Sequence, residues 1–440
     1  MNLAASDEPP SGAEPVGGAG ASGGPASGTE AGGAGARARF LREDLTTLWP
    51  APGQFELAGR RLVKRRDGMS YAVLPNGRSP ALLLPTQPRA VAATILRNYK
   101  TSATSLSRAK FGAAALAARF GALRFMPSQV VVHDGTGCPG SDLIGYLREV
   151  LGHDLHVAVY MGSPRANRKP VLQILGPDAQ TVAFAKVGTN ALTRELVDHE
   201  ARALAFLTAR PMSAVATPRV LHHGLWNGHE ILVQEALGQG GTRRAVISSL
   251  LQRAMVDVAG LEGVVTCNAR DSSYWRRLDD RISNLQPDAQ GVRLKSELDA
   301  LNPVAASTEI AFGAWHGDWT PWNMLCQGDR IQVWDWERFE TDVPVGFDAL
   351  HFALQRAVAR DHEQARSAAT RLLESSAGLL APFGTSMGAA RLVATLYLLD
   401  LGARYLKDGQ QDAGAALGNL RTWLLPAVAD SSQRRRNIGS

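Results

Sequence analysis

The chain has 440 residues, 45% hydrophobic and 20% charged, with a formal net charge of +6 and a pI of about 9.4. This composition is ordinary for a globular protein with two or three cores, and no apolar run reaches the roughly 18 to 20 residues that a membrane span needs. The basic pI raises nucleic-acid binding as a competing class, but the densest basic stretch, 60–66, has no interleaved aromatic residues or nucleic-acid motif. We therefore expect neither nucleic acid nor membrane as a partner.

Residues 1–37 are rich in Gly, Ala, Ser and Pro without periodicity, which predicts a disordered tail. This segment has no apolar core of the kind found in secretory signals. The cysteines, Cys138, Cys267 and Cys326, are odd in number and far apart. Such spacing favours a reducing compartment without structural zinc, so we expect a cytoplasmic protein.

Residues 38–150 are expected to fold, but they contain no group of residues that suggests chemistry. Apolar runs and turn residues predict strands at 62–63, 71–74, 81–84 and 129–132, and helices at 88–100, 105–120 and 142–151. We interpret this segment as an N-terminal extension packed on the domain that follows. An independent domain is the alternative.

Two strands are predicted next, at 155–160 and 170–175. The loop between them lacks the G-x-G-x-x-G pattern but holds Gly162, Ser163 and several basic residues. Backbone N–H groups and positive charge in such a loop suit an anionic group. A plain basic hairpin loop explains the same pattern.

Lys186 is the last residue of the strand expected at 181–186. Its side chain lies on the same face of that strand as Val182 and Phe184. The helix expected at 191–208 places Glu200 on its leucine stripe, whereas Glu195 lies about 100° away by the helical period. Because a carboxylate on a buried face needs a cation, we predict that Glu200 pairs with Lys186. An ordinary strand-end lysine and an ordinary salt bridge on a helix face are the alternatives.

A β-hairpin is predicted over 220–234, since Asn227-Gly228 between two β-prone runs favours a tight turn. His222 and His223 are adjacent in the first strand, so their side chains face opposite sides, which argues against a metal site. The second strand leads into a glycine-rich linker after Leu237.

The run 316–323 contains residue types at a spacing that suggests a catalytic site. Asp318 and Asn323 stand five positions apart, the separation of base and metal ligand in the protein-kinase catalytic loop, and Asp335 ends an apolar strand-like run. Oxygen ligands such as those of Asn323 and Asp335 hold Mg²⁺ beside nucleotide phosphates. Asp318 can accept the proton of an attacking hydroxyl, with His316 steadying the loop.

His316-Gly317-Asp318 with Asn323, then Asp335, resembles the motif of the aminoglycoside phosphotransferase and choline kinase superfamily. The resemblance covers about residues 150 to 430. It implies an α+β fold of two lobes like that of protein kinases: a small antiparallel β lobe at 151–238 and a mainly helical large lobe at 239–430, with a frayed basic tail at 431–440.

The resemblance also implies the ligands, ATP and Mg²⁺, and their contacts. Lys186 held by Glu200 would meet the α- and β-phosphates, Gly162 and Ser163 would cover the phosphates, and Asp348 would brace the catalytic loop. Adenine would meet backbone groups of the hinge between the lobes, at Gln234, Glu235, Ala236 and Leu237.

The acceptor site is expected in helical segments at 242–300 and 347–427. Arg and Lys at least match Asp and Glu there, which disfavours a polycation, although Asp271, Asp279, Asp280 and Asp361 are candidate pocket acids. We therefore expect an ATP-dependent phosphotransferase acting on a hydroxyl of a small molecule such as a sugar, an amino alcohol or an aminoglycoside-like compound. The alternative is an inactive nucleotide-binding interaction protein of the same fold.

Overall fold

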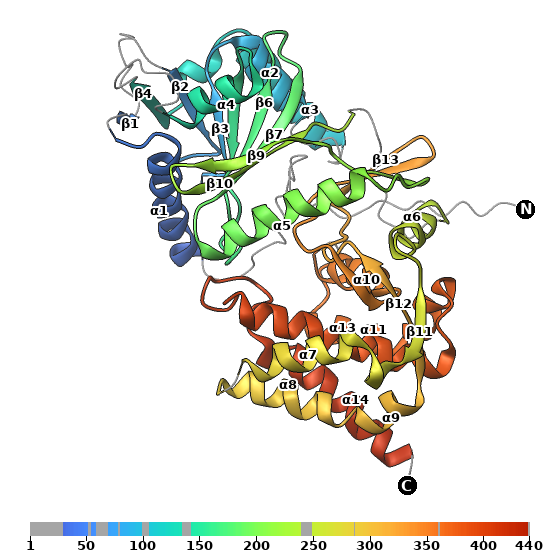
Figure 1. The fold of residues 1–440 in the computed structure, drawn as a ribbon. Helices are drawn as coiled ribbons and strands as arrows, with labels where there is room; N and C mark the ends of the chain where they lie inside the picture. The colour runs from blue at the N-terminus through green and yellow to red at the C-terminus, as the bar shows by residue number, and fades with distance from the viewer. Residues whose placement is uncertain are drawn as a thin grey trace, which may run out of the picture.

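The computed structural model describes residues 30–51, 54–58, 69–77, 80–98, 105–133, 142–238, 249–285, 287–359 and 361–438. The first half of the chain forms a strand-rich lobe and the second half a mainly helical one (Figure 1). The predicted α+β architecture of two lobes is confirmed. The predicted strand at 62–63, the basic stretch 60–66 and Cys138 lie outside the described residues.

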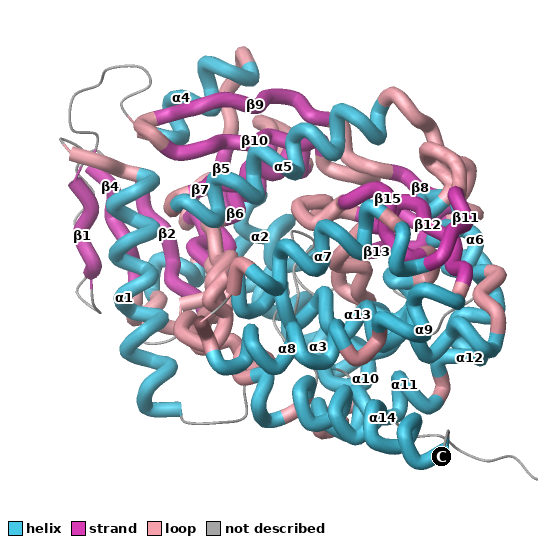
Figure 2. Tube along the Cα trace, turned by 60° about the horizontal axis from the view of Figure 1, so that its bottom comes forward, coloured by secondary structure: helices cyan, strands magenta, loops and turns pink. Residues whose placement is uncertain are grey.

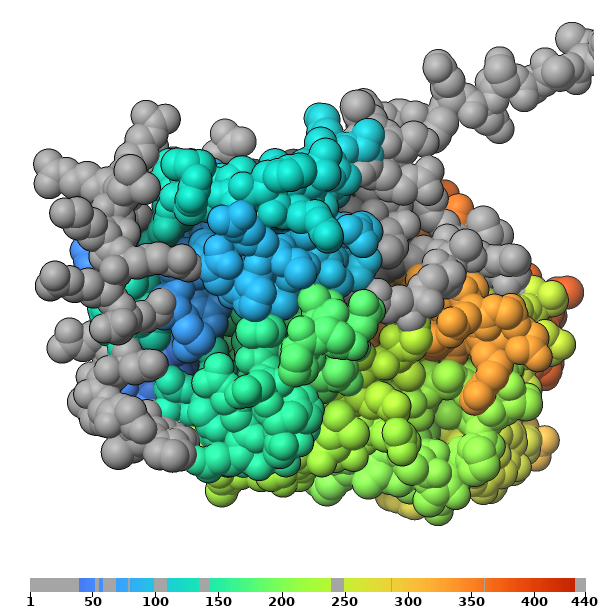
Figure 3. Space-filling view, turned by 90° about the horizontal axis from the view of Figure 1, so that it is seen from above, coloured from blue at the N-terminus to red at the C-terminus, as the bar shows by residue number. Residues whose placement is uncertain are grey.

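The small lobe is built on one nine-stranded sheet, in the order β1-β4-β2-β3-β5-β6-β7-β10-β9. Leu82 of β3 pairs with Tyr160 of β5, so the N-terminal strands extend the same sheet. Seen from above, the blue to teal surface of the first elements merges with the green surface of β5 to β7 (Figure 3). The strands are β1 (Gln54–Ala58), β2 (Met69–Leu74), β3 (Leu82–Pro85), β4 (Gln129–His133), β5 (His156–Tyr160), β6 (Val171–Leu175), β7 (Thr181–Gly188), β9 (Val220–Trp226) and β10 (His229–Glu235).

Helices cover both faces of this sheet. Alternation along β7 places Ala185 in the core under α1 and α4, and Phe184 against the core under α2 and α3. These helices are α1 (Glu30–Leu48), α2 (Arg89–Asn98), α3 (Ser105–Arg119) and α4 (Leu143–Leu151), with the short helix η1 (Ala122–Phe125) after α3. The helices and strands expected after residue 70 are therefore present.

Both expected tails are shorter than predicted. Residues 30–37 are the first turns of α1, and α14 (Leu424–Ile438) continues as a helix through the basic end. In both helices the other end is anchored in a core, α1 by Leu45 and α14 by Val428. Each helix therefore runs from a packed end into the segment that we expected to be a tail.

The large lobe is mainly helical, and α5 (Ala191–Thr208) lies between it and the small-lobe sheet (Figure 1). Cyan helices make up most of this lobe in Figure 2. They are α6 (Ser249–Ala259), η2 (Ala269–Asp271), α7 (Ser273–Ser283), α8 (Ala289–Asp299), α9 (Asn302–Ser307), α10 (Phe347–Ala359), α11 (Ala365–Glu374), α12 (Ser376–Leu380), η3 (Ala381–Phe383), α13 (Met387–Lys407) and η4 (Leu420–Thr422).

Two small sheets position the segment 316–323 and the segment that follows β14. One has the order β11 (Val265–Asn268), β12 (Glu309–Trp315), β15 (Glu340–Pro344), and the other has the order β13 (Met324–Gln327), β14 (Arg330–Val333), β8 (Val215–Ala216). The segment 316–323 connects β12 to β13, and Asp335 follows β14. The two sheets therefore bring both parts of the predicted motif to one region.

Among the described helices, none alone has both the length and the apolar character to cross a membrane. The helical segments 376–383 and 387–407 meet both conditions only when taken together, and the chain bends by 102° between them.

Candidate active site

The loop between β12 and β13 is held in one conformation by its backbone. Gly317 has φ +84°, and a Cβ there would lie 2.2 Å from the carbonyl oxygen of Arg338, so only glycine fits. The carboxylate of Asp348 accepts the backbone N–H groups of His316 at 2.8 Å and Gly317 at 3.2 Å. Asp348 thus braces this loop from the first turn of α10.

His316 fixes the direction of the next residue. The backbone N–H of Asp318 donates to Nδ1 of His316 at 3.1 Å, so Nε2 carries the proton and donates to the carbonyl of Trp334 at 3.0 Å. Burial lowers the pKa of His316 to about 4 despite the nearby carboxylates. The imidazole is therefore neutral at pH 7 and connects the loop to the end of β14.

Asp318 presents an ionised carboxylate to the cavity described below. Oδ1 lies 2.9 Å from Nε2 of His351, and Oδ2 accepts the side-chain amide of Asn323 at 3.1 Å. Burial would raise the pKa of Asp318, but the hydrogen bond from His351 and the charge of Arg404 outweigh it and lower the pKa. Its side chain remains 24% exposed, so a ligand can reach it.

Sequence reasoning gave no role to His351. The imidazole is buried, and its Nδ1 lies 3.0 Å from the hydroxyl of Tyr397, which completes a chain Tyr397–His351–Asp318. Burial lowers the pKa of His351, which favours the neutral ring. The spacing from Asp348 could have indicated a role for His351, because the two residues stand three apart and share one face of α10.

Asn323 offers an oxygen with no protein donor. Its Nδ2 donates to both the carbonyl and the carboxylate of Asp318, at 3.0 and 3.1 Å. Its Oδ1 is buried and has no hydrogen-bond partner in the described part of the chain. An unpaired buried carbonyl-type oxygen is costly, and it is also the type of ligand that Mg²⁺ prefers.

Lys186, Glu200 and Asp335 meet at the boundary between the lobes. Nζ of Lys186 lies 2.6 Å from both carboxylate oxygens of Glu200 and 2.7 Å from Oδ1 of Asp335. Glu195, the other candidate, instead lies 3.6 Å from Lys407 on the surface. Asp335 adopts a φ of +73°, a conformation that Asp tolerates better than most residues.

The electrostatics of this group are strongly coupled. Burial alone would lower the pKa of Lys186, but the carboxylates of Asp335, Glu200 and Glu337 outweigh it and raise the pKa. Burial raises the pKa of Glu200, and Lys186 only partly opposes the rise. The ammonium is therefore what holds these carboxylates together.

Glu337 is the second residue to which sequence reasoning gave no role. One oxygen each from Glu200, Asp335 and Glu337 lie within 4.8 Å of one another, a group able to hold a cation. Glu337 is bound by the ammonium of Lys169 and, at 3.0 Å, by the side-chain amide of Asn167. The Asp-x-Glu spacing after a strand was the available signal.

The loop 161–170 closes over this group. Its backbone reaches the large lobe at Ala166, whose N–H donates to Oε1 of Gln410 at 3.3 Å. Arg168 instead turns to α1 and binds both oxygens of Asp44, at 2.7 and 3.0 Å. Gly162 and Ser163 lie half-buried at the start of the loop. Arg168 and Lys169 are thus engaged by Asp44 and Glu337.

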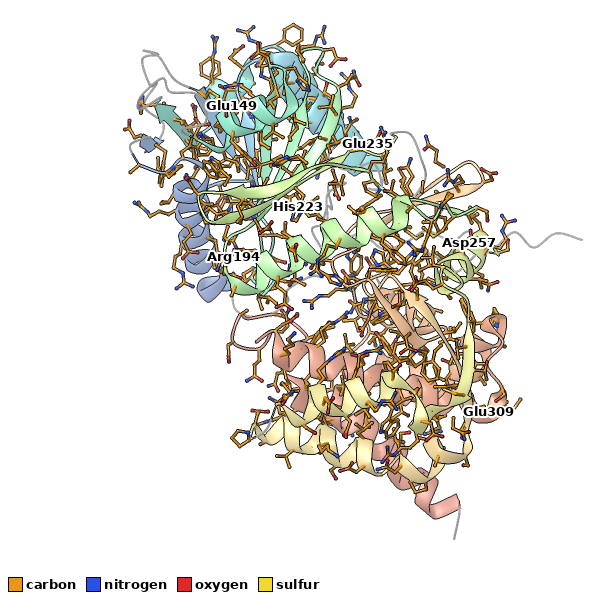
Figure 4. All side chains as sticks on the ribbon, in the orientation of Figure 1. Glu149, Arg194, His223, Glu235, Asp257 and Glu309 are labelled. Carbon is orange, nitrogen blue, oxygen red and sulfur yellow. The ribbon has the colours of Figure 1, made fainter. Side chains whose placement is uncertain are left out.

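The hinge begins where β10 ends. The N–H groups of Glu235 and Ala236 donate to the carbonyls of Arg219 at 2.8 Å and Val182 at 3.1 Å, so neither is directed at a ligand. Glu235, labelled in Figure 4 at the end of the small-lobe sheet, has its carboxylate held by Arg219. Gln234 is buried, and its Oε1 has no partner among the described residues.

A cavity of about 170 Å³ lies beside Asp318. Asp318 and Glu337 both line it, so the loop between β12 and β13 and the segment after β14 face one space. None of the acids that we considered for the acceptor pocket (Asp271, Asp279, Asp280 and Asp361) lines it. The other lining residues are Arg165, Asn167, Trp322, Arg338, Gln355, Val358, Ala359, Arg404, Tyr405, Asp408, Gln410, Ala415, Ala416 and Leu417.

No family model matches the sequence, and no curated protein matches it. Among solved structures, the chain is similar to an aminoglycoside phosphotransferase, APH(4)-Ia, at 17% identity and TM-score 0.44, covering 66% of this chain and 99% of that one. A ternary complex of a variant of that protein holds ADP and hygromycin B.

The chain is also similar to two putative fructosamine-3-kinases, both at TM-score 0.40. The one from Haemophilus somnus is 15% identical and is covered over 95% of its length, with 64% of this chain. The one from Thermobifida fusca is 17% identical and is covered over 98%, with 66% of this chain. At this level of similarity we base the function on the geometry of the site.

Proposed function

We propose that this protein transfers the γ-phosphoryl group of ATP to a hydroxyl of a small molecule in a reaction that requires Mg²⁺. The observation that carries the proposal is the buried contact of Lys186 with Glu200 and Asp335, next to a cavity lined by the ionised Asp318. An ammonium oriented by a glutamate and a nearby oxygen cluster suit a triphosphate.

The residues present fit a magnesium ion, because the buried Oδ1 of Asn323 has no partner among the described residues and Asp335 follows Trp334, whose N–H donates to the carbonyl of Asn323. These two side chains would hold the ion, with Glu337 as a further oxygen nearby. When bound, Mg²⁺ neutralises charge on the β- and γ-phosphates. Lys186 would turn from Asp335 toward the α- and β-phosphates, while Glu200 keeps its ammonium in place.

Asp318 would act on the acceptor. Its carboxylate accepts the proton of the acceptor hydroxyl as that oxygen forms a bond to the γ-phosphorus and the bond to the β-phosphate oxygen breaks, which releases ADP. His351 and the backbone anchored by His316 keep the carboxylate oriented. In the hinge, the amide of Leu237 is the best placed of the expected adenine contacts, since those of Glu235 and Ala236 bind protein carbonyls.

Two substitutions test these roles. Asp318→Ala should abolish transfer while calorimetric affinity for Mg-ATP stays within about two-fold, because Asp318 acts on the acceptor and not on the nucleotide. Asp335→Ala should weaken Mg-ATP binding itself by roughly ten-fold or more, since it removes a metal oxygen. Asp329→Asn, in the exposed turn between β13 and β14, is the matched control. It should change neither the transfer rate nor the affinity for Mg-ATP.

ATP consumption across a panel of hydroxyl compounds is the direct assay. Mg-ATP binding without turnover on any acceptor would favour the inactive interaction protein instead. Equal loss of ATP binding in both variants, with folding intact, would refute the division of roles. We further propose that the enzyme acts in the cytoplasm, where Mg-ATP is available and isolated cysteines such as Cys267 and Cys326 stay reduced.

A further inference from the structure

Two of the three carboxylates that line the cavity beside Asp318, those of Glu337 and Asp408, are already bound by cations. Lys169 binds Glu337, and Arg338 binds Asp408 through two guanidinium nitrogens. The charge of Arg404 helps to lower the pKa of Asp318. An acceptor with several ammonium groups would need carboxylates without such partners. Among the described residues, the cavity offers it only Asp318, the residue that would accept the proton of the acceptor hydroxyl.

Arg404 gives the cavity a positive site close to the reacting carboxylate. It projects from α13, and its Nη1 donates to the carbonyl of Gly317 at 2.7 Å, which ties the guanidinium to the catalytic loop. Its side chain also lies over the ring of Trp315, 5.9 Å from the centroid. A guanidinium has five N–H donors in a rigid fork. Among the described residues, the bond to Gly317 uses one of them, which leaves other donors for a ligand.

Part of the cavity lining is apolar. It comprises Val358 and Ala359 at the end of α10 and the segment 415–417. The volume of about 170 Å³ is close to the roughly 150 Å³ of a cavity that holds one benzene ring. The cavity therefore suits a molecule of about one ring with an apolar face.

We propose that the acceptor is a small hydroxy compound with an anionic group, whose hydroxyl faces Asp318 and whose anionic oxygens bind Arg404. This inference rests on the proposed function for the identity of the hydroxyl as the reacting group. The binding preference itself depends only on the cavity. Arg404 is then a specificity-determining residue.

The test compares three compounds of one shape in the full-length protein: hydroxymethyl-benzoate, hydroxymethyl-benzamide and hydroxymethyl-benzylamine, each as the meta and para isomer. Calorimetry without nucleotide measures their affinities, so the result does not depend on phosphoryl transfer. We expect the benzoate to bind roughly ten-fold to a hundred-fold more tightly than the benzylamine, with the benzamide between them, because a charged hydrogen-bonded pair stabilises by about 1.5–3 kcal/mol.

Arg404→Gln should remove this preference, and Arg404→Lys should keep part of it, since lysine retains the charge without the fork. Lys407→Gln, at a 59% exposed position on the same helix, is the control and should leave the preference unchanged. If Arg404→Gln does not fold, salt dependence replaces it: benzoate affinity in the wild type should fall with ionic strength while benzamide affinity does not.

Equal affinities, a preference for the benzylamine, binding of none of the probes, or an unchanged preference in Arg404→Gln would overturn the inference. ATP consumption is measured separately on the same preparations. A preference for the anion without turnover would refute the proposed function and leave the charge of the cavity established. Turnover with a preference for the cation would support the proposed function and refute the inference about the charge of the cavity.

Discussion

Replacing Lys186 by methionine removes the cation that three buried carboxylates share. Methionine is close to lysine in volume, so the change acts mainly on charge. Glu200 and Asp335 lose bonds of 2.6 and 2.7 Å and stay buried, whereas Glu337 keeps Lys169. Breaking a buried ion pair by deleting one partner costs about 3–5 kcal/mol. We expect a loss of free energy of unfolding of that size at pH 8.

This loss should shrink as the pH falls. The pKa of Glu200 is already raised by burial in the wild type, and without the ammonium it rises further. An acid whose pKa in the folded state lies above its unfolded value adds stability when protonated and loses it as the pH rises through the folded pKa. The deficit of Lys186→Met should therefore be largest at pH 8 and decrease toward pH 4.5, the ordinary value for a glutamate.

Urea denaturation of both proteins between pH 8 and pH 5 measures the difference. The double variant Lys186→Met with Glu200→Leu should recover much of the stability, because well-packed apolar residues replace a buried pair at little cost. Lys407→Met, on the exposed surface of α13, should change stability by less than about 0.5 kcal/mol. A deficit independent of pH, or no recovery in the double variant, would show that Lys186 is not the shared counter-charge.

Three further perturbations follow from single contacts. Gly317→Ala forces a Cβ to 2.2 Å from the Arg338 carbonyl, so we expect a thermal unfolding midpoint lower by several degrees and loss of transfer; an active, stable variant would exclude the observed loop. Burial raises the pKa of Asp348 to about 7, so the folded state gains stability as the pH falls from about 7 to 4. Asp348→Asn should abolish that gain, which is on the order of 2 kcal/mol. Denaturation of both proteins at pH 8 and at pH 5 measures it. Arg168→Met leaves the buried carboxylate of Asp44 unpaired and should cost about 3–5 kcal/mol in the same assay, whereas Asp44→Asn should cost less because it leaves only the more weakly hydrated guanidinium.

The local pattern of the chain was enough to place most of the elements that carry the site. The helix expected at 191–208 coincides with α5, and the hairpin around Asn227 is present as β9 and β10. The leucine stripe also selected Glu200 over Glu195, because helical period alone decides which side chains share the buried face. Spacing along the chain predicted these features because each depends on residues close in sequence.

The tails and the two missed residues, Glu337 and His351, show where that approach fails. The start of α1 at Glu30 depends on anchoring by Leu45 in a core made of distant strands, which local composition does not reveal. The role of Glu337 depends on its contact with Lys169, which lies in a loop of the other lobe. His351 likewise depends on Tyr397, 46 residues later in the chain.

By itself the sequence determined which residue types stand at chemically useful spacings, and hence the class of chemistry that they predict and its central carboxylates. Only the tertiary structure decided which of them share a cation, which oxygen has no donor among the described residues, and which charges line the cavity beside Asp318. The physical reason is that pairing and burial depend on contacts between segments far apart in the chain, and these contacts set the electrostatic energy of every group in the site.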